Sequence, residues 1–108
     1  MSEGRGAGPG ESPSAAAEEI RVRRDAPAGR FEILVDDVVA GFAEYHDSAG
    51  VREFPHTVVA SEFGGRGLAG RLVSEALRVT SDEGLSVRPS CSFVARYIEK
   101  NPGSAQVA

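Results

Sequence analysis

The sequence predicts a small, mixed α+β domain, in which a meander of four antiparallel strands is followed by a helix, a parallel fifth strand and a C-terminal helix. Apolar and polar residues alternate in short runs over the first part of the chain, whereas apolar residues recur at helical spacing from Leu68 onward. The expected strands are joined by segments of turn length, which are typical of antiparallel neighbours. With 108 residues, 41% of them hydrophobic, the chain is long enough for one domain.

Short alternating runs indicate the four strands of the meander. They cover residues 20–23, 31–35, 38–45 and 51–60. Asp36-Asp37 is typical of a tight turn between the second and third strands, and residues 47–50 form a turn cluster before the fourth. Pro55 lacks the N–H that a strand ladder needs, so the fourth strand is expected to be bulged at Pro55 or to lie at an edge of the sheet.

A change from strand spacing to helical spacing marks the second half of the chain. Gly84 is expected to cap a long helix, one face of which carries Leu68, Leu72, Val73, Ala76, Leu77 and Thr80. Residues 85–88 form a short fifth strand, and Ser90 is the predicted N-cap of a last helix that runs to about Lys100. Because the fourth strand, the long helix and the fifth strand form one crossover unit, the two strands are expected to run parallel.

The composition of the chain changes near its two ends. Residues 1–18 contain no Val, Ile, Leu or aromatic residue, and Gly, Pro, Ser and Ala dominate there. Such a segment cannot bury enough apolar surface to offset its ordering entropy, so we expect a disordered N-terminal tail. The folded domain is expected to span residues 19–102, and residues 103–108 are expected to fray.

Composition and charge exclude several classes of function. The single cysteine, Cys91, cannot form an internal disulfide, and with only two histidines beside it no metal site is expected. The net charge of −4 argues against nucleic acid as a partner. No apolar run approaches the roughly 20 residues that span a bilayer, and the N-terminus lacks the pattern of a secretory signal. We therefore expect a cytoplasmic protein that binds neither a membrane nor nucleic acid.

A glycine-rich stretch, residues 64–71, lies between an expected strand and the start of the long helix. Its glycines permit a sharp turn and close approach of a ligand, and the free N–H groups of the first helical turn attract phosphate. We expect a pyrophosphate cradle to which Arg66 or Arg71 adds charge; a glycine-rich turn that binds nothing is the alternative. The match of residues 65–70 to G-x-G-x-x-G does not indicate a nicotinamide site, because the next strand ends in Arg88 rather than in an acidic residue.

Three motifs, in the same order along the chain, resemble the GNAT N-acetyltransferase superfamily. The glycine loop is similar to its acetyl-CoA loop, Arg/Gln-x-x-Gly-x-Gly/Ala, through Gly67 and Ala69, although Gly64 stands where that superfamily has Arg or Gln. His56-Thr57-Val58-Val59 resembles the H-T-x-V segment of a minimal, single-domain group of the superfamily, and residues 89–98 resemble that group's P-x-C-x-F-V-x-x-Y-I signature. Together the motifs extend the resemblance over nearly the whole expected domain.

The resemblance implies an N-acetyltransferase that uses acetyl-CoA as its cosubstrate and transfers the acetyl group to an amine. The pantetheine arm would pair with the backbone of Thr57, Val58 and Val59 like an added strand. The pyrophosphate would lie on the glycine loop. The residues that the loop would contribute are Gly64, Gly65, Arg66, Gly67, Leu68, Ala69, Gly70 and Arg71.

Three residues are candidates for the chemistry. Cys91 is expected at a helix N-terminus, where the pKa of its thiol should fall, so it could accept the acetyl group or exchange a proton; a buried structural cysteine is the alternative. His56 could serve as a general base, although a lone histidine in a strand is more often structural. Tyr97 occupies a place similar to that of the tyrosine that protonates the CoA thiolate in larger members of the superfamily, and its alternative role is core packing.

The acceptor side of the site is expected to be open, because only seven residues, 24–30, join the first two strands and only a tail follows Asn101. An open site suits a large amine acceptor, such as a protein lysine or N-terminus, and a monomer or weak homodimer. Two other function classes stay open: a non-catalytic acyl-CoA-binding module, and an interaction domain whose cleft binds a peptide strand.

Overall fold

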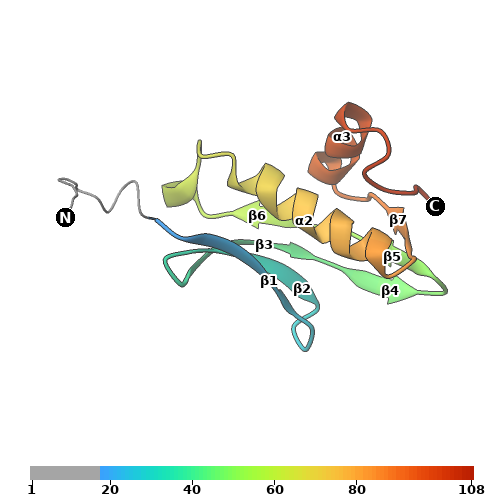
Figure 1. Ribbon diagram of the computed structural model, residues 1–108, viewed down its shortest axis with the longest axis horizontal. Helices are drawn as coiled ribbons and strands as arrows, with labels where there is room; N and C mark the ends of the chain where they lie inside the picture. The colour runs from blue at the N-terminus through green and yellow to red at the C-terminus, as the bar shows by residue number, and fades with distance from the viewer. Residues whose placement is uncertain (1–17) are drawn as a thin grey trace, which may run out of the picture.

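The computed structural model describes residues 18–108 (Figure 1). The predicted disorder of residues 1–18 falls on a segment of which residues 1–17 lie outside the described residues. The described elements are β1 (Ile20–Asp25), β2 (Arg30–Val35), β3 (Val38–Glu44), β4 (His46–Ser48), β5 (Val51–Glu53), β6 (Thr57–Val59), the 3₁₀ helix η1 (Ser61–Phe63), α2 (Leu68–Asp82), β7 (Ser86–Arg88) and α3 (Ser92–Lys100).

The strands form two sheets rather than one. The larger sheet has the order β1-β2-β3-β6, and all its neighbours are antiparallel. The smaller sheet has the order β4-β5-β7, in which β5 and β7 run parallel. The predicted mixed α+β fold and the parallel crossover through the long helix are confirmed, but only residues 51–53 of the expected fourth strand pair with β7.

The expected third strand, residues 38–45, corresponds to β3 and is followed by an additional strand, β4, whereas the expected fourth strand is divided at Pro55 into β5 and β6. The N–H of Tyr45 donates to the Gly29 carbonyl oxygen at 2.9 Å, in register with the Arg30–Glu44 pair, and the chain then continues from His46 as β4 in the second sheet. Pro55 has no N–H to donate, and the chain passes there from β5 back to the first sheet, where β6 is an edge strand. The expected turn at residues 47–50 is correspondingly tighter, because Asp47 and Ser48 belong to β4.

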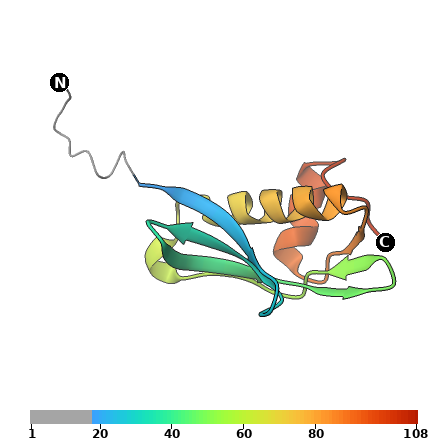
Figure 2. The ribbon, with the colours of Figure 1, turned by 60° about the horizontal axis from the view of Figure 1, so that its bottom comes forward.

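The core lies between the larger sheet and α2, which crosses one face of it, while α3 lies beside α2 (Figures 1 and 2). The residues of α2 that are buried are the six predicted ones: Leu68, Leu72, Val73, Ala76, Leu77 and Thr80. They meet strand residues that alternate along β2, including Phe31, Ile33 and Val35. Gly84 follows the helix with φ of 75°, and the N–H of Leu85 returns to the Thr80 carbonyl oxygen at 3.1 Å, as expected for a glycine C-cap.

A buried arginine ties the smaller sheet to the end of α2. Arg52 on β5 is 1% exposed, and its guanidinium donates to both carboxylate oxygens of Asp47, at 2.7 and 2.8 Å. It also donates to Thr80 Oγ1 at 3.1 Å and lies 2.9 Å from a carboxylate oxygen of Glu83. The burial of this cation depends on carboxylates that come from β4 and from the residue after α2, so the alternation within β5 did not predict it.

The chain end differs from the expectation that residues 103–108 fray. The N–H of Val87 donates to the Gln106 carbonyl oxygen, and the N–H of Ala108 donates to the Val87 carbonyl oxygen, both at 2.8 Å. Val107 thereby forms a parallel bridge with Val87. The last residues follow the edge of β7 because that edge has backbone groups that β5 does not pair. Neither of the described α-helices has the length and apolar character that crossing a membrane requires.

Candidate active site

The candidate site lies where β6 diverges from β7. Pairing of the smaller sheet extends one step beyond β5 and β7, through the Phe54 N–H to the Arg88 carbonyl oxygen at 3.0 Å. The N–H of Cys91 then donates to the Phe54 carbonyl oxygen at 2.8 Å. After Pro55 the chain pairs with β3 instead, starting with the Glu44 N–H and the His56 carbonyl oxygen at 2.9 Å. Strands that run side by side up to Phe54 therefore diverge from that point.

Beside this divergence, no strand among residues 18–108 pairs with the second backbone edge of β6. Phe42 on β3 lies opposite Val58, and the Ala60 N–H donates to the Ala40 carbonyl oxygen at 2.8 Å. Because backbone groups of successive residues point to opposite sides of an antiparallel strand, those of Thr57 and Val59 point away from β3. The free edge of β6 can thus accept one further extended segment.

Cys91 lies next to this free edge. Its Sγ is 3.6 Å from Thr57 Oγ1, although the two residues are 34 positions apart. Cys91 is itself the N-cap residue of α3, whereas Ser90, the predicted N-cap, donates its hydroxyl to Glu53 at 2.5 Å. The cap moves by one residue because the carboxylate of β5 satisfies the serine, and this places the thiol at the helix start.

The surroundings of Cys91 favour its thiolate. Partial burial disfavours the charged form, but hydrogen bonds from the Val94 N–H, the Thr57 hydroxyl, the Phe93 N–H and the Thr57 N–H outweigh it, so the pKa of the Cys91 thiol is lowered. The donors come from the first turn of α3 and from the free edge of β6. A larger fraction of this thiol is therefore ionised near neutral pH than of an ordinary surface cysteine.

The glycine loop presents unsatisfied donors to open space. Gly65 and Gly67 have φ values of 78° and 74°, and Gly67 is the N-cap residue of α2. Within the described part of the chain, none of the backbone N–H groups from Gly65 to Gly70 donates to an acceptor; the helical ladder starts with the Arg71 N–H, 3.3 Å from the Gly67 carbonyl oxygen. A Cβ added at Gly65, Gly67 or Gly70 would meet nothing within 4 Å. Free donors in open space at the positive end of a helix suit an anion.

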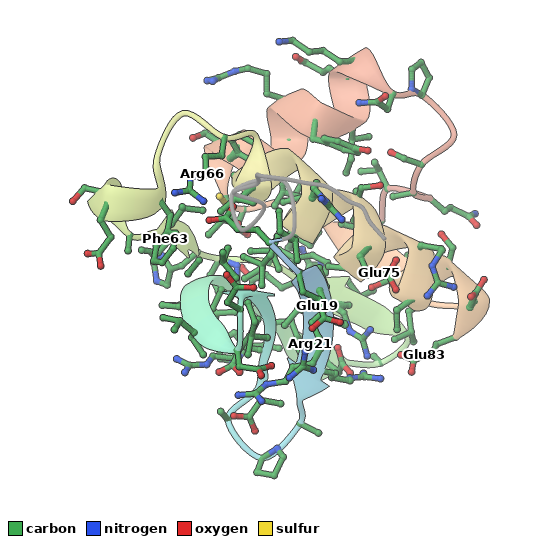
Figure 3. The ribbon with its side chains drawn as sticks, turned by 60° about the vertical axis from the view of Figure 1, so that its left-hand side comes forward. Glu19, Arg21, Phe63, Arg66, Glu75 and Glu83 are labelled. Atoms are coloured by element: carbon green, nitrogen blue, oxygen red, sulfur yellow. The ribbon has the colours of Figure 1, made fainter. Side chains whose placement is uncertain are left out.

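The two arginines of the loop, Arg66 and Arg71, differ in the contacts that their guanidinium groups make. Arg66 lies over the Phe63 ring, with 5.5 Å from its guanidinium carbon to the ring centroid, and Figure 3 shows the two side by side. Its guanidinium is 3.0 Å from the Glu18 carboxylate. Arg71 forms no ion pair with any residue from 18 to 108, and it lines a cavity of about 610 Å³ together with Gly67 and Gly70. Of the two, Arg71 is the cation free to meet a ligand.

Among the described residues, no side-chain hydrogen bond joins Tyr97 or His56 to the Cys91–Thr57 pair. Tyr97 of α3 lines the 610 Å³ cavity beside the glycine loop, and it also packs against the hydrophobic core. The side chain of His56 is exposed and has no hydrogen-bond partner among the described residues. The structure therefore brings the sequence-predicted residues together in two groups, Cys91 with Thr57 at the strand divergence, and Tyr97 with the loop.

Two of the predicted binding residues, Leu68 and Val58, have side chains that lie outside the candidate site. Leu68 is 2% exposed and its side chain belongs to the core. Val58 projects onto the outer face of the larger sheet, where it lines a separate cavity with Val39 and Phe42. The hydroxyl of Thr57 is a functional group that sequence reasoning missed, since only its backbone was assigned; the proximity of Thr57 to Cys91 comes from the tertiary structure.

The fold and the separated strands define a class of protein. The model of the family described as GCN5-related N-acetyl-transferase matches residues 30–107, and the chain belongs to this family. Its relatives include Protein NATD1 of Mus musculus, 27% identical over 96 residues, which cover 84% of this chain and 87% of the mouse protein. Protein NATD1 of Xenopus tropicalis is 28% identical over 89 residues, which cover 80% of this chain and 81% of that protein.

Two solved structures share the fold. The GCN5-related N-acetyltransferase from Kribbella flavida superimposes with a TM-score of 0.54 at 21% identity, over 68% of this chain. The PaiA N-acetyltransferase from Thermoplasma acidophilum, in complex with coenzyme A, superimposes with a TM-score of 0.53 at 17% identity, over 70% of this chain. This chain spans only 21% of the first and 55% of the second of these solved chains. The predicted membership of the GNAT superfamily is confirmed.

Proposed function

We propose that this protein transfers an acetyl group from acetyl-CoA to an amine of another protein, a lysine side chain or an N-terminus. The observation that carries the proposal is the divergence of β6 from β7, which leaves a free strand edge beside the lowered-pKa thiol of Cys91. Family membership supports the acetyl transfer. The short β1–β2 connection, Ala26–Gly29, adds no helix over the acceptor side and so supports a large acceptor.

The residues present fit a coenzyme A molecule along its length. The Thr57 carbonyl oxygen and the backbone groups of Val59 would hold the amide groups of the pantetheine arm, in the manner of an added strand. The unpaired N–H groups of the Gly65–Gly70 segment and the Arg71 guanidinium would hold the pyrophosphate. Glycine is suited to the loop because a side chain there would occupy the open space into which the phosphates would fit.

The chemistry at the thioester end would fall to Cys91. When the amine attacks the thioester carbon, a C–N bond forms, the C–S bond breaks, and the attacking amine must lose a proton while the departing thiolate gains one. As a thiolate, Cys91 can take the proton from the amine; it can also accept the acetyl group itself and pass it on to the amine. The Thr57 hydroxyl would hold the thiolate in place by donating to it. Tyr97 lies on the loop side and would donate a proton only to a group that reaches its cavity.

The test combines binding with turnover. Acetyl-CoA titrated into the labelled protein should shift the amide resonances of residues 57–59 and 64–71, and CoA release should follow when a lysine peptide or a protein N-terminus is supplied. Binding at these residues without release of CoA from acetyl-CoA in the presence of any amine would leave an acyl-CoA-binding module and refute the transfer. Shifts confined to another face would refute the proposed site altogether.

A further inference from the structure

A second, smaller cavity adjoins Tyr97 on α3. It measures about 230 Å³ and is lined by Phe93, Arg96, Tyr97 and Lys100. These residues are spaced three, four and seven positions apart, so they form one stripe along the helix. Tyr97 also lines the 610 Å³ cavity that contains Gly67, Gly70 and Arg71. One side chain thus borders both the glycine loop and this stripe.

The stripe carries positive charge that the rest of the described chain does not neutralise. Arg96 and Lys100 form no ion pair or side-chain hydrogen bond with residues 18–108, and neither does Arg71 across Tyr97. By contrast, the carboxylate of Glu75, which borders the larger cavity, is held by Arg78 at 2.5 Å. Three uncompensated cations therefore surround Tyr97, and a bound anion would meet no free carboxylate among the lining residues.

The stripe also exposes an aromatic ring. Phe93 is 37% exposed although it is a large hydrophobic residue. A flat ring next to an arginine and a lysine combines a stacking surface for a base with cations for a phosphate. These are the groups that an adenine nucleotide carrying a phosphate monoester requires, and such a monoester has a charge of about −1.5 to −2 at pH 7.

We propose that Phe93, Arg96 and Lys100 form the subsite for the adenosine 3′-phosphate end of coenzyme A, with Phe93 stacking on the adenine and the two cations binding the 3′-phosphate. The proposal rests on the proposed function, because it takes the pyrophosphate to lie on the glycine loop. Tyr97 borders both the cavity at that loop and the cavity at the stripe. The nucleotide end of the ligand would therefore extend along α3, while the pantetheine runs along β6. The subsite would make the protein select coenzyme A over its 3′-dephospho form.

The test compares coenzyme A with 3′-dephospho-coenzyme A by calorimetry. The wild type should bind coenzyme A about tenfold more tightly, a difference of about 1.4 kcal/mol. Arg96→Gln and Lys100→Gln should each weaken coenzyme A several-fold, leave the dephospho form unchanged, and so bring the two Kd values together. Arg88→Gln is the matched control: it removes an arginine that also has no ion pair among the described residues but lines neither cavity, and the ratio of Kd values should stay at the wild-type level.

A second variant tests the adenine contact. Phe93→Leu keeps an apolar side chain and should weaken coenzyme A and its dephospho form equally, while 4′-phosphopantetheine, which lacks adenine, should bind as it does to the wild type. Thermal melting of each variant checks that it is folded. Equal wild-type affinity for coenzyme A and its dephospho form would overturn the subsite and leave the proposed function intact. If none of the three ligands binds the folded wild type, the proposed function fails with it.

Discussion

The pKa of the Cys91 thiol depends on the first turn of its own helix and on Thr57, which is 34 positions away in the chain. Its thiol faces the first turn of α3 and the hydroxyl and N–H of Thr57, and these donors lower its pKa in spite of partial burial. A free cysteine titrates at roughly 8.5. Because a lower pKa raises the thiolate fraction at any pH below it, alkylation of Cys91 by iodoacetamide should reach half its maximal rate at a lower pH than alkylation of a free cysteine does.

The contribution of Thr57 can be separated from that of the helix. Thr57→Val keeps the shape of the side chain but removes the hydroxyl that donates to the thiolate, so the pKa of Cys91 should rise and the pH midpoint of alkylation should move upward. Thr57→Ser keeps the hydroxyl and should leave the midpoint near the wild-type value. An unchanged midpoint in Thr57→Val would mean that the N–H groups of α3 and β6 determine the thiolate population without the hydroxyl.

The catalytic part of the proposal is tested at the same residue. Cys91→Ala should lose most of its turnover with an amine acceptor while it binds acetyl-CoA nearly as tightly as the wild type, because the loss then lies in the transition state. Cys91→Ser keeps the size of the side chain but not its acidity, and it should lose turnover as well. Normal turnover in folded Cys91→Ala would return Cys91 to a packing role and transfer the chemistry to His56 or Tyr97.

At the scale of the element, the start of α2 contains a glycine, Gly70, at which the stability of the helix and the affinity for the ligand favour different residues. Gly70 lies within the helix, and a Cβ added there meets nothing within 4 Å, so Gly70→Ala should stabilise the folded protein by about 0.5–1 kcal/mol. The same methyl group would project into the cavity beside the loop, where the phosphates are proposed to lie, so the affinity for acetyl-CoA should fall. Urea unfolding and calorimetry on one sample measure the two effects.

A gain in stability together with a loss of affinity for acetyl-CoA in Gly70→Ala would show that the glycine permits ligand approach at the expense of helix stability. A gain in stability with unchanged affinity would contradict the placement of the pyrophosphate. Gly67→Val is a less discriminating variant, because its φ of 74° strains a β-branched residue whether or not a ligand binds.

The elements themselves were predictable where local pattern determines them. The six buried positions of α2 follow from helical spacing, and the turn at Asp36-Asp37 follows from residue types that tolerate φ values of 49° and 68°. At Pro55 the sequence predicted a bulge or an edge position but not a change of sheet, and β4 was not predicted, because both depend on which of two sheets each segment joins. In the site, the loop was predictable from its glycines, whereas the approach of Thr57 to Cys91 joins residues from different elements.

At the scale of the whole molecule, one buried cation links the smaller sheet to the helical layer. Figure 2 shows the β4–β5 hairpin extending away from the larger sheet, so it depends on contacts with the end of α2. Arg52 supplies these contacts through Thr80 and Glu83, while Asp47 of β4 binds the same guanidinium from within the hairpin. Since β5 also carries β7, and β7 leads into Cys91 and α3, the position of the thiol depends on this linkage.

Arg52→Met tests the linkage, because it keeps the length and apolar packing of the side chain and removes the charge. The variant should lower the free energy of unfolding by about 1–3 kcal/mol, since Asp47, Thr80 and Glu83 each lose a donor. The carboxylates of Asp47 and Glu83 are 42% and 38% exposed and can regain water, so the loss should stay below that for a fully buried pair.

Arg78→Met, which breaks exposed ion pairs on α2, is the control and should leave the urea midpoint unchanged. Because the Arg52 guanidinium is buried, the difference between the two variants should persist at high salt. A loss in Arg52→Met that disappears at high salt would show that the contacts act as a surface ion pair and do not anchor the smaller sheet.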